Sequence, residues 1–306
     1  MTEKRIAGVI GLGSMGMGAA RSLVASGVET WGTDVRAESV ADIVANGGKG
    51  AASPAELASK VDALLVLVVN AAQTESVLFG ETGAVKHMKK GAVVVASSTV
   101  PAAYARELEG RLAEYGLLMV DAPVSGGAAK AATGEMTVMG SGTPAAFEAA
   151  EFLLNGIASK VYRLGDQAGP GSTVKTINQL LAGVHIAAAA EAMALGIRAG
   201  VAPADLFEVI SNSAGASWMF NNRVPHILDG DYAPLSAVNI FVKDLGIVLE
   251  TGKELTFPLP LSAAAHQQFL GAAAAGLGKE DDSAVIKVFQ KLAGIDLPEA
   301  KDAKDD

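Results

Sequence analysis

The hydrophobic positions in the first half of the chain alternate between short continuous runs and helical spacing. Residues 5–10 form an apolar run, and residues 14–26 follow with the spacing of an amphipathic helix. Residues 62–69 are almost wholly apolar, which is typical of a strand buried on both faces of a parallel sheet. Similar strand-like runs occupy residues 28–33, 92–96 and 117–120. Ser53, Pro54 and Glu56 match the start of a helix, with serine as the N-cap, proline at the first helical position and glutamate at the capping-box position. This alternation predicts an α/β fold, in which helices cover both faces of a parallel sheet.

The pattern changes after about residue 165, where the strand-like runs end. Residues 171–199 form one long apolar helical stretch, with Gly200 and Pro203 just beyond it. Further helical patterns cover residues 203–211, 238–253, 259–275 and 283–292. We therefore expect an α/β domain in residues 1–168, a long connecting helix that opens an all-α domain in residues 169–298, and a charged tail in residues 299–306.

Composition and charge exclude several functional classes. The 306 residues carry a formal net charge of −9 and contain no cysteine. This argues against a nucleic-acid partner, which needs clustered basic residues, and it excludes disulfides and cysteine nucleophiles. The four histidines are scattered without zinc-ligand spacing, so no metal is expected. The first residues have no signal-peptide layout, and His185 and Glu191 interrupt the most apolar stretch. We expect a soluble, cytoplasmic protein with no membrane partner.

A glycine-rich motif lies directly after the first predicted strand and opens the first predicted helix. It comprises Gly11, Leu12, Gly13, Ser14, Met15 and Gly16. In this context the glycines allow a tight turn, a close approach to a pyrophosphate and close packing of helix on strand, which predicts a dinucleotide site. Asp34 ends the second strand, at the spacing of a residue that binds the adenine ribose of NAD. Its carboxylate favours NAD, whereas the nearby Arg36 could favour NADP. The alternative to a dinucleotide site is that the motif is only a glycine-rich turn.

Polar residues also follow the other predicted strands. Val69 ends the apolar run of residues 62–69 and Asn70 follows it, Thr99 lies three residues after the run of residues 92–96, and Asp121 follows the run of residues 117–120. The carboxyl ends of parallel strands share one edge of the sheet, where open α/β sheets bind ligands. Ordinary turn chemistry accounts for each residue singly. Their coincidence at one edge favours function, and we predict that Val69 and Asn70 contribute to the cofactor site.

The long apolar helix carries one lysine, Lys175, near its start. Most helix lysines are simply solvated, but Val174, Ile177 and Leu181 surround this one with apolar neighbours. Desolvation would favour the neutral amine, which could accept a proton from a substrate hydroxyl. Asn178 and Gln179 follow at the third and fourth positions after the lysine, so they share its face of the helix, and His185 lies roughly on that side further along.

Two more segments carry chemistry. Ser125, Gly126 and Gly127 offer a hydroxyl and accessible backbone N–H groups, which could hold a carboxylate or form only a turn. Lys243 and Asp244 precede Leu245; such a pair alone is usually a surface ion pair.

Taken together, these four ordered motifs resemble the β-hydroxyacid dehydrogenase family over almost the whole chain. The resemblance implies an N-terminal Rossmann domain, a long connecting helix, an all-α C-terminal domain and NAD-dependent oxidation of a small hydroxy acid. It implies that Lys175 is the catalytic acid/base and that Asn178 orients either the lysine or the reacting oxygen. It also implies a homodimer or homotetramer, and it assigns further residues to the site. Those residues are Ser125, Gly126 and Gly127 for the substrate carboxylate, and Thr99 and Lys243 for the nicotinamide end of the cofactor.

Two residues depart from the usual family pattern. Gln179 stands where a second asparagine is usual, and Asn70 stands where proline is usual. With His185, they are most similar to the branch that oxidises L-threonate to 2-dehydro-L-erythronate, and a longer amide suits a substrate with several hydroxyls. Oxidation of 3-hydroxyisobutyrate and reduction of tartronate semialdehyde are the alternatives within the family. A dinucleotide-binding sensor without catalysis is the alternative of a different class.

Overall fold

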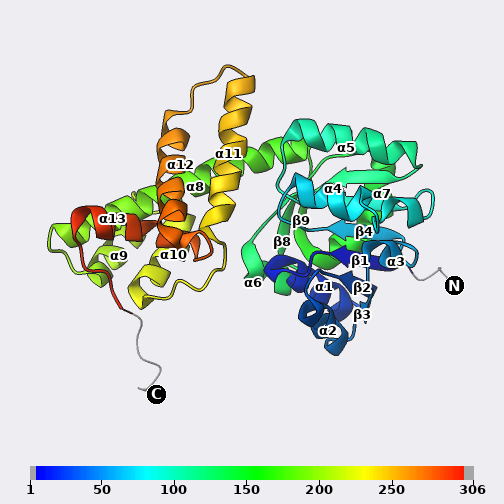
Figure 1. Ribbon diagram of the computed structural model, residues 1–306, viewed down its shortest axis with the longest axis horizontal. Coiled ribbons are helices and arrows are strands. Elements are labelled where there is room, and N and C mark those ends of the chain that lie inside the picture. Colours follow the sequence, from blue (N-terminus) through cyan, green and yellow to red (C-terminus); the bar gives the residue numbers. More distant parts are fainter. Residues whose placement is uncertain (1–4, 300–306) are drawn as a thin grey trace. The chain divides into compact units, whose positions relative to one another are not determined.

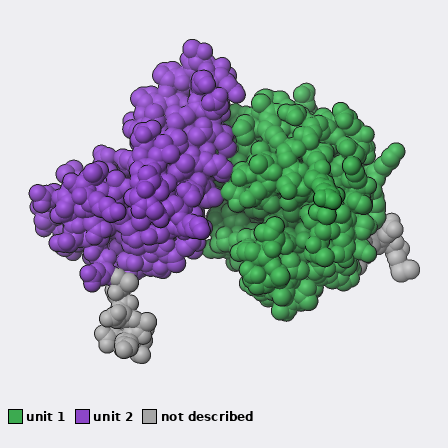
Figure 2. All heavy atoms as spheres, in the orientation of Figure 1, with its two compact units in different colours: residues 1–175 green, residues 176–306 purple. Residues whose placement is uncertain are grey.

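The computed structural model describes residues 5–299, so the predicted charged tail lies outside the described residues except for Glu299. The chain forms two compact units, Met1–Lys175 and Thr176–Asp306, coloured green and purple in Figure 2. The division falls inside helix α8 (Pro170–Arg198), which continues from one unit into the other (Figure 1). The domain limits expected from the sequence, at residues 168 and 298, stay a prediction.

The first unit contains the predicted parallel sheet. Its six strands lie in the order β3-β2-β1-β4-β5-β6, and all pairings are parallel. The strands are β1 (Ile6–Ile10), β2 (Glu29–Thr33), β3 (Lys49–Gly50), β4 (Ala63–Val66), β5 (Val93–Ala96) and β6 (Leu118–Asp121). The helices are α1 (Ser14–Ala25), α2 (Ala37–Ala45), α3 (Pro54–Ala58), α4 (Ala71–Phe79), α5 (Ala102–Glu114), α6 (Gly127–Ala132) and α7 (Pro144–Ile157), with a 3-10 turn at Val85–His87. The α/β fold class expected from the alternating pattern is confirmed.

Apolar side chains bury both faces of this sheet. In β4, Leu65 belongs to a core that includes Leu23 of α1 and Leu153 of α7. The neighbouring Leu64 belongs to a second core, with Leu108 of α5. Successive residues of a strand point to opposite faces, so a strand between two helical layers must be apolar at every position. The continuous apolar runs in the sequence follow from this constraint.

A second, three-stranded sheet extends the first unit, and the sequence pattern did not predict it. It consists of β7 (Val124–Ser125), β8 (Met136–Gly140) and β9 (Ala158–Arg163). β7 pairs antiparallel with β8, and β8 pairs parallel with β9. The pairing of Ser125 with Thr137 holds the start of the Ser125–Gly127 segment on an ordered strand rather than in a free loop.

The carboxylate of Asp121, at the end of β6, holds the start of α8. Its Oδ2 accepts hydrogen bonds from the backbone N–H groups of Gly169 and Ser172, both at 2.9 Å. Its Oδ1 accepts from Ser172 Oγ at 2.7 Å, and Ser141 Oγ donates to Oδ2 at 3.1 Å. Asp121 is 1% exposed, and a buried carboxylate is stable only when such donors replace water. The polar residue expected at the ligand edge of the sheet therefore serves α8.

The second unit is helical, as expected. After α8 it contains α9 (Pro203–Ser211), α10 (Trp218–Asp229), α11 (Val238–Glu254), α12 (Pro260–Ala272) and α13 (Ile286–Ala293), with a π turn at Ala273–Leu277 and a 3-10 turn at Asp282–Val285. Ile186 and Met193 of α8 pack in one core with Phe241 of α11 and Phe269 of α12. By length and composition α8 could also cross a membrane, but so could a core helix, and it is the one described helix that passes this weak test.

The sequence pattern did not predict α10, because Pro225 lies inside it. Tertiary contacts compensate. Arg223 on α10 donates to Asp282 from Nε at 2.5 Å and from a terminal nitrogen at 3.1 Å. Burial raises the pKa of Asp282 to about 6, even though the guanidinium of Arg223 acts to lower it. This buried pair ties α10 to the 3-10 turn before α13.

Candidate functional site

The three motif glycines have three different surroundings. Gly11 has a φ of +92°, and a Cβ there would lie 2.5 Å from the carbonyl oxygen of Leu67. A Cβ on Gly16 would lie 1.8 Å from the carbonyl oxygen of Gly11. A Cβ on Gly13 would meet no atom within 4 Å. Gly11 and Gly16 are therefore required by the protein's own packing, whereas Gly13 leaves an open backbone surface at the start of α1. Such a cradle fits a dinucleotide pyrophosphate.

The other motif residues offer mainly backbone to a ligand. Leu12 is 2% exposed and packs in the core between the sheet and α1, and Met15 packs against the same core. Ser14 begins α1, whose N-cap Gly13 has no side-chain hydrogen bond, so the first N–H groups are not capped by a side chain.

Asp34 and Arg36 hold the glycine-rich loop in place. Asp34 Oδ2 accepts from Leu12 N at 2.7 Å, and Oδ1 accepts from Arg36 N at 2.9 Å and from Arg36 Nε at 3.2 Å. The guanidinium of Arg36 also donates to Leu12 O at 3.0 Å. Burial acts to raise the pKa of Asp34, but the hydrogen bonds from Arg36 and Leu12 outweigh it and lower the pKa. Asp34 is therefore an anion that also pins the glycine-rich loop.

The residues predicted at the other strand ends have local partners. Asn70 caps α4: its Oδ1 accepts from Gln73 N at 2.9 Å, while Gln73 Oε1 accepts from Val69 N at 2.9 Å. This reciprocal cap explains the asparagine without a ligand. Val69 is 46% exposed, and Thr99 is half-buried after the β5 turn. Their predicted cofactor contacts stay predictions.

Lys175 lies beside the predicted carboxylate-binding segment. Its side chain is buried, and its Nζ donates to the carbonyl oxygen of Val124 at 2.9 Å. Val124 immediately precedes Ser125, and the chain then turns through Gly126 and Gly127, whose φ values are +133° and +70°. These left-handed conformations favour glycine. Two motifs separated by about 50 residues in the sequence thus bring a primary amine, a hydroxyl and a glycine turn together in the first unit.

A chain of polar side chains links α8 and α11 in the second unit. Asn178 Nδ2 donates to Gln179 Oε1 at 3.0 Å, and Gln179 Nε2 donates to Asp244 Oδ2 at 2.5 Å. Lys243 Nζ lies 2.6 Å from Asp244 Oδ1, in an ion pair whose angles fall outside hydrogen-bond geometry. The Lys243–Asp244 pair is therefore not the usual surface pair, since Asp244 is 2% exposed. The role of Asp244 could not be predicted from the sequence, because its partner Gln179 is 65 residues away.

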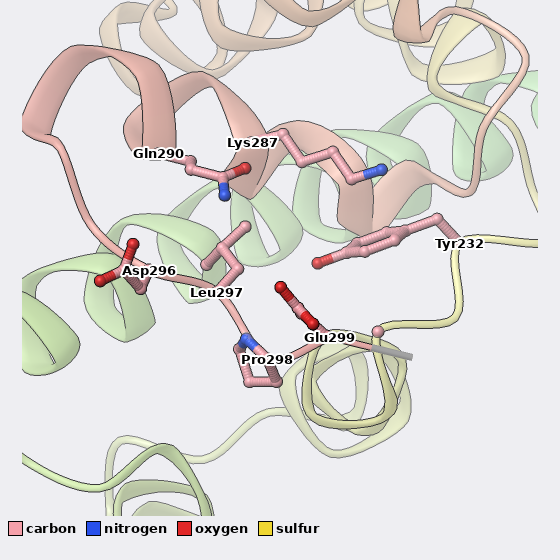
Figure 3. A pocket seen from close by; sticks show the side chains of 8 residues that line it. Tyr232, Lys287, Gln290, Asp296, Leu297, Pro298 and Glu299 are labelled. Atoms are coloured by element: carbon pink, nitrogen blue, oxygen red, sulfur yellow. The ribbon is translucent and has the colours of Figure 1, made fainter. Parts of the chain in front are cut away.

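A pocket of about 370 Å³ lies elsewhere in the second unit (Figure 3). Lys287 and Tyr232 face each other there, with Nζ 3.9 Å from the ring centre, and Lys287 also pairs with Glu280 at 2.5 Å. Burial raises the pKa of Tyr232 to about 12. None of the predicted site residues lines this pocket, which is completed by Gly230, Gln290, Asp296, Leu297, Pro298 and Glu299.

Comparison with known proteins identifies relatives over nearly the full length. A model of the NAD binding domain of 6-phosphogluconate dehydrogenase matches residues 6–165, and a model described as the NAD-binding of NADP-dependent 3-hydroxyisobutyrate dehydrogenase matches residues 169–289. L-threonate dehydrogenase of Cupriavidus necator is 62% identical, over 95% of this chain and 97% of the relative. L-threonate dehydrogenase of Escherichia coli K12 is 57% identical, over 96% and 97%.

A solved structure shows the same fold. The crystal structure of a protein described as 3-hydroxyisobutyrate dehydrogenase from Salmonella typhimurium is 56% identical, with a TM-score of 0.90 over 93% of this chain and 99% of that chain. The family models describe NAD binding, and the names of these relatives divide between two hydroxy acids.

Two glycine substitutions should separate cofactor binding from folding. Gly13→Ala adds a methyl group in open space, so we expect Tm to stay within about 2 °C of the original protein while the Kd for NAD rises about tenfold or more. Gly16→Ala forces a methyl group onto the Gly11 carbonyl, so we expect Tm to fall by about 5–10 °C. Thermal unfolding and calorimetric titration with NAD measure both. Unchanged NAD affinity in Gly13→Ala would exclude this loop as the pyrophosphate site.

Proposed function

The chain belongs to the β-hydroxyacid dehydrogenases of the 3-hydroxyisobutyrate dehydrogenase type, and we propose that this NAD-dependent enzyme oxidises L-threonate to 2-dehydro-L-erythronate. Relatives with 53–62% identity carry the L-threonate dehydrogenase name, which supports this substrate. The name of the Salmonella typhimurium structure favours 3-hydroxyisobutyrate as the second candidate. Both are small acids with a hydroxyl near a carboxylate, so one site chemistry serves either.

The observation that carries the chemical proposal is the contact between Lys175 Nζ and Val124 O at 2.9 Å. It directs the amine to the strand that ends in Ser125. A carboxylate held by the Ser125 hydroxyl and by backbone N–H groups of Gly126 and Gly127 would then place the neighbouring hydroxyl carbon beside the amine. Proximity of this kind lowers the barrier by removing the need to collect and orient the reacting groups.

In the proposed reaction, NAD held at the glycine-rich loop would supply the acceptor for the hydride that leaves C2 of the acid. The neutral amine of Lys175 accepts the proton of the C2 hydroxyl, and the C–O bond becomes a ketone as the C–H and O–H bonds break. Ser125, Gly126 and Gly127 hold the carboxylate, and Asn178, three residues after Lys175 on α8, orients the reacting oxygen. Gln179 adds a further contact to the substrate. Residues 5–299 contain no cluster of histidine, cysteine, aspartate and glutamate suited to a metal ion.

The cofactor preference is a separate proposal. The anionic Asp34 would accept hydrogen bonds from an adenine ribose and repel a 2′-phosphate, which supports NAD. Arg36 is already engaged with Asp34 and with Leu12 O, which makes it a poorer phosphate partner than its position in the sequence indicated. The same proposal includes contacts between the cofactor and four further residues: Val69, Asn70, Thr99 and Lys243.

The proposed assembly is a homodimer or homotetramer. Apolar side chains along α8 are exposed, among them Ile177, Leu181 and Leu195, the last to 70%. A soluble chain rarely leaves such a row of large apolar side chains in water. The cytoplasmic location stays a prediction.

A panel of acids tests the substrate. With NAD, kcat/KM for L-threonate should exceed that for 3-hydroxyisobutyrate by about 100-fold, because a site that pairs extra substrate hydroxyls loses those pairs with the simpler acid. Initial rates of NADH formation at 340 nm measure this; tartronate semialdehyde is assayed in the reverse direction with NADH. Good turnover of 3-hydroxyisobutyrate with none of L-threonate would reject the substrate.

Substitution of the lysine tests the mechanism. Lys175→Ala should lower kcat by about 10²–10⁴-fold, the usual contribution of a general base, and leave the Kd for NAD within about threefold. Lys253→Ala, which removes an exposed lysine from α11, is the matched control and should behave like the original enzyme. Unchanged turnover in Lys175→Ala would overturn the assignment, and intact NAD binding shows that the variant is folded.

Light scattering tests the assembly. At micromolar concentration the enzyme should have two or four times the mass of one chain, and Leu195→Asp should shift the distribution toward smaller species, because a charge in an apolar interface is costly. A mass of one chain at all concentrations would contradict the proposal.

A further inference from the structure

Asp244 is the most buried member of the polar chain between α8 and α11. It is 2% exposed, and both of its carboxylate oxygens are engaged. Oδ2 receives the Gln179 Nε2 hydrogen bond, and Oδ1 lies 2.6 Å from Lys243 Nζ. Gln179 is itself only 8% exposed. A buried carboxylate with a cation on one oxygen and an amide donor on the other has no freedom to exchange its partners, because an unpaired buried charge is expensive.

This carboxylate decides which way two amides point. An ionised aspartate only accepts hydrogen bonds, so Gln179 must turn its NH₂ group toward Asp244. The Oε1 of Gln179 then points away from Asp244 and accepts a hydrogen bond from Nδ2 of the preceding residue, Asn178, at 3.0 Å. The NH₂ group of Asn178 thus donates to Gln179. The carbonyl oxygen of Asn178 makes no hydrogen bond within the described part of the chain, so it remains available as an acceptor.

We infer that Asp244 is a positioning residue: acting through Gln179, it makes Asn178 present a hydrogen-bond acceptor, not a donor, to a hydroxyl of the bound acid. The inference rests on the proposed function, which places the acid beside Lys175 and Asn178. An acceptor there selects a ligand that carries a hydroxyl hydrogen at that point, which suits a polyhydroxylated acid better than a methyl-substituted one. Reversed amides would point an NH₂ group at the same hydroxyl.

Gln179 is long enough to serve both partners at once. Its two amide atoms bridge Asp244 on α11 and Asn178 on α8, and a side chain one methylene shorter would lose one of the two contacts. Lys243 supports the arrangement from the other side, since its ammonium nitrogen lies 2.6 Å from Asp244 Oδ1.

A charge-conserving swap tests this inference. In Gln179→Glu two carboxylates meet, and in Asp244→Asn the single carbonyl oxygen cannot serve both Lys243 and Gln179. Each single variant should lower kcat/KM for L-threonate by about 10–100-fold, mainly through KM, with the KM for NAD unchanged. In the double variant Q179E/D244N, the new amide donates to Glu and turns its carbonyl oxygen toward Lys243, and Glu accepts from Asn178. The double variant should regain most of the kcat/KM lost in the single variants, short of the original value because Glu has no amide hydrogen to offer the substrate.

Matched controls carry the same substitutions on the surface of the second unit. Gln267→Glu and Asp205→Asn change exposed residues and should leave kcat/KM unchanged. Thermal unfolding of all variants provides a readout without substrate: the single variants should lose several degrees in Tm and the double variant should regain them, because the contact is restored.

The outcomes separate the two proposals. Recovery of Tm without recovery of kcat/KM in the double variant would reduce Asp244 to a structural residue and overturn the inference. Single variants with the original kcat/KM would overturn it as well. If the original enzyme turns over another acid of the panel but not L-threonate, the substrate proposal fails, and the same variants are assayed with that acid. If it oxidises none of them, the proposed function fails, and the inference fails with it.

Discussion

The start of helix α8 depends on one buried carboxylate. Asp121 receives four hydrogen bonds, three of them from Gly169 and Ser172, at the point where the chain leaves the α/β unit and enters α8. Hydrogen bonds to a charged group contribute about 1.5–3 kcal/mol each, which together can offset the several kcal/mol needed to bury the charge. A Cβ at Gly171 would lie 2.4 Å from the Met139 carbonyl oxygen, so the helix can begin only with this close backbone packing.

The position of Lys175 follows from that anchor. It lies one helical turn after Ser172, so a fixed helix start directs the amine to Val124 O. The same helix then continues to Asn178 and Gln179, whose amides are held by each other and by Asp244. One helix therefore carries both the lysine proposed to transfer the proton and the polar contacts that follow it, and a helix leaves a side chain less freedom than a loop would.

The sequence predicted the α/β and helical parts well because their signals are local or periodic. The apolar run in β4 and the cap formed by Ser53 and Glu56 in α3 are both present as expected. It did not predict α10, because Pro225 opposes a helix locally and the compensating Arg223–Asp282 pair joins residues 59 positions apart. It also did not predict the sheet of β7, β8 and β9, whose strand β7 is only two residues long.

For the site, the sequence by itself determined which chemical groups are available and where backbone freedom is needed. The glycine-rich motif and the residue types at positions 34, 175 and 178 belong to this part, because a turn, a cap or a helix face involves residues only a few positions apart. Only the tertiary structure decided what the buried carboxylates do. Asp121 serves α8 and Asp244 orients Gln179, because burial leaves a charged group no water and each must take its partners from whichever distant segment packs against it.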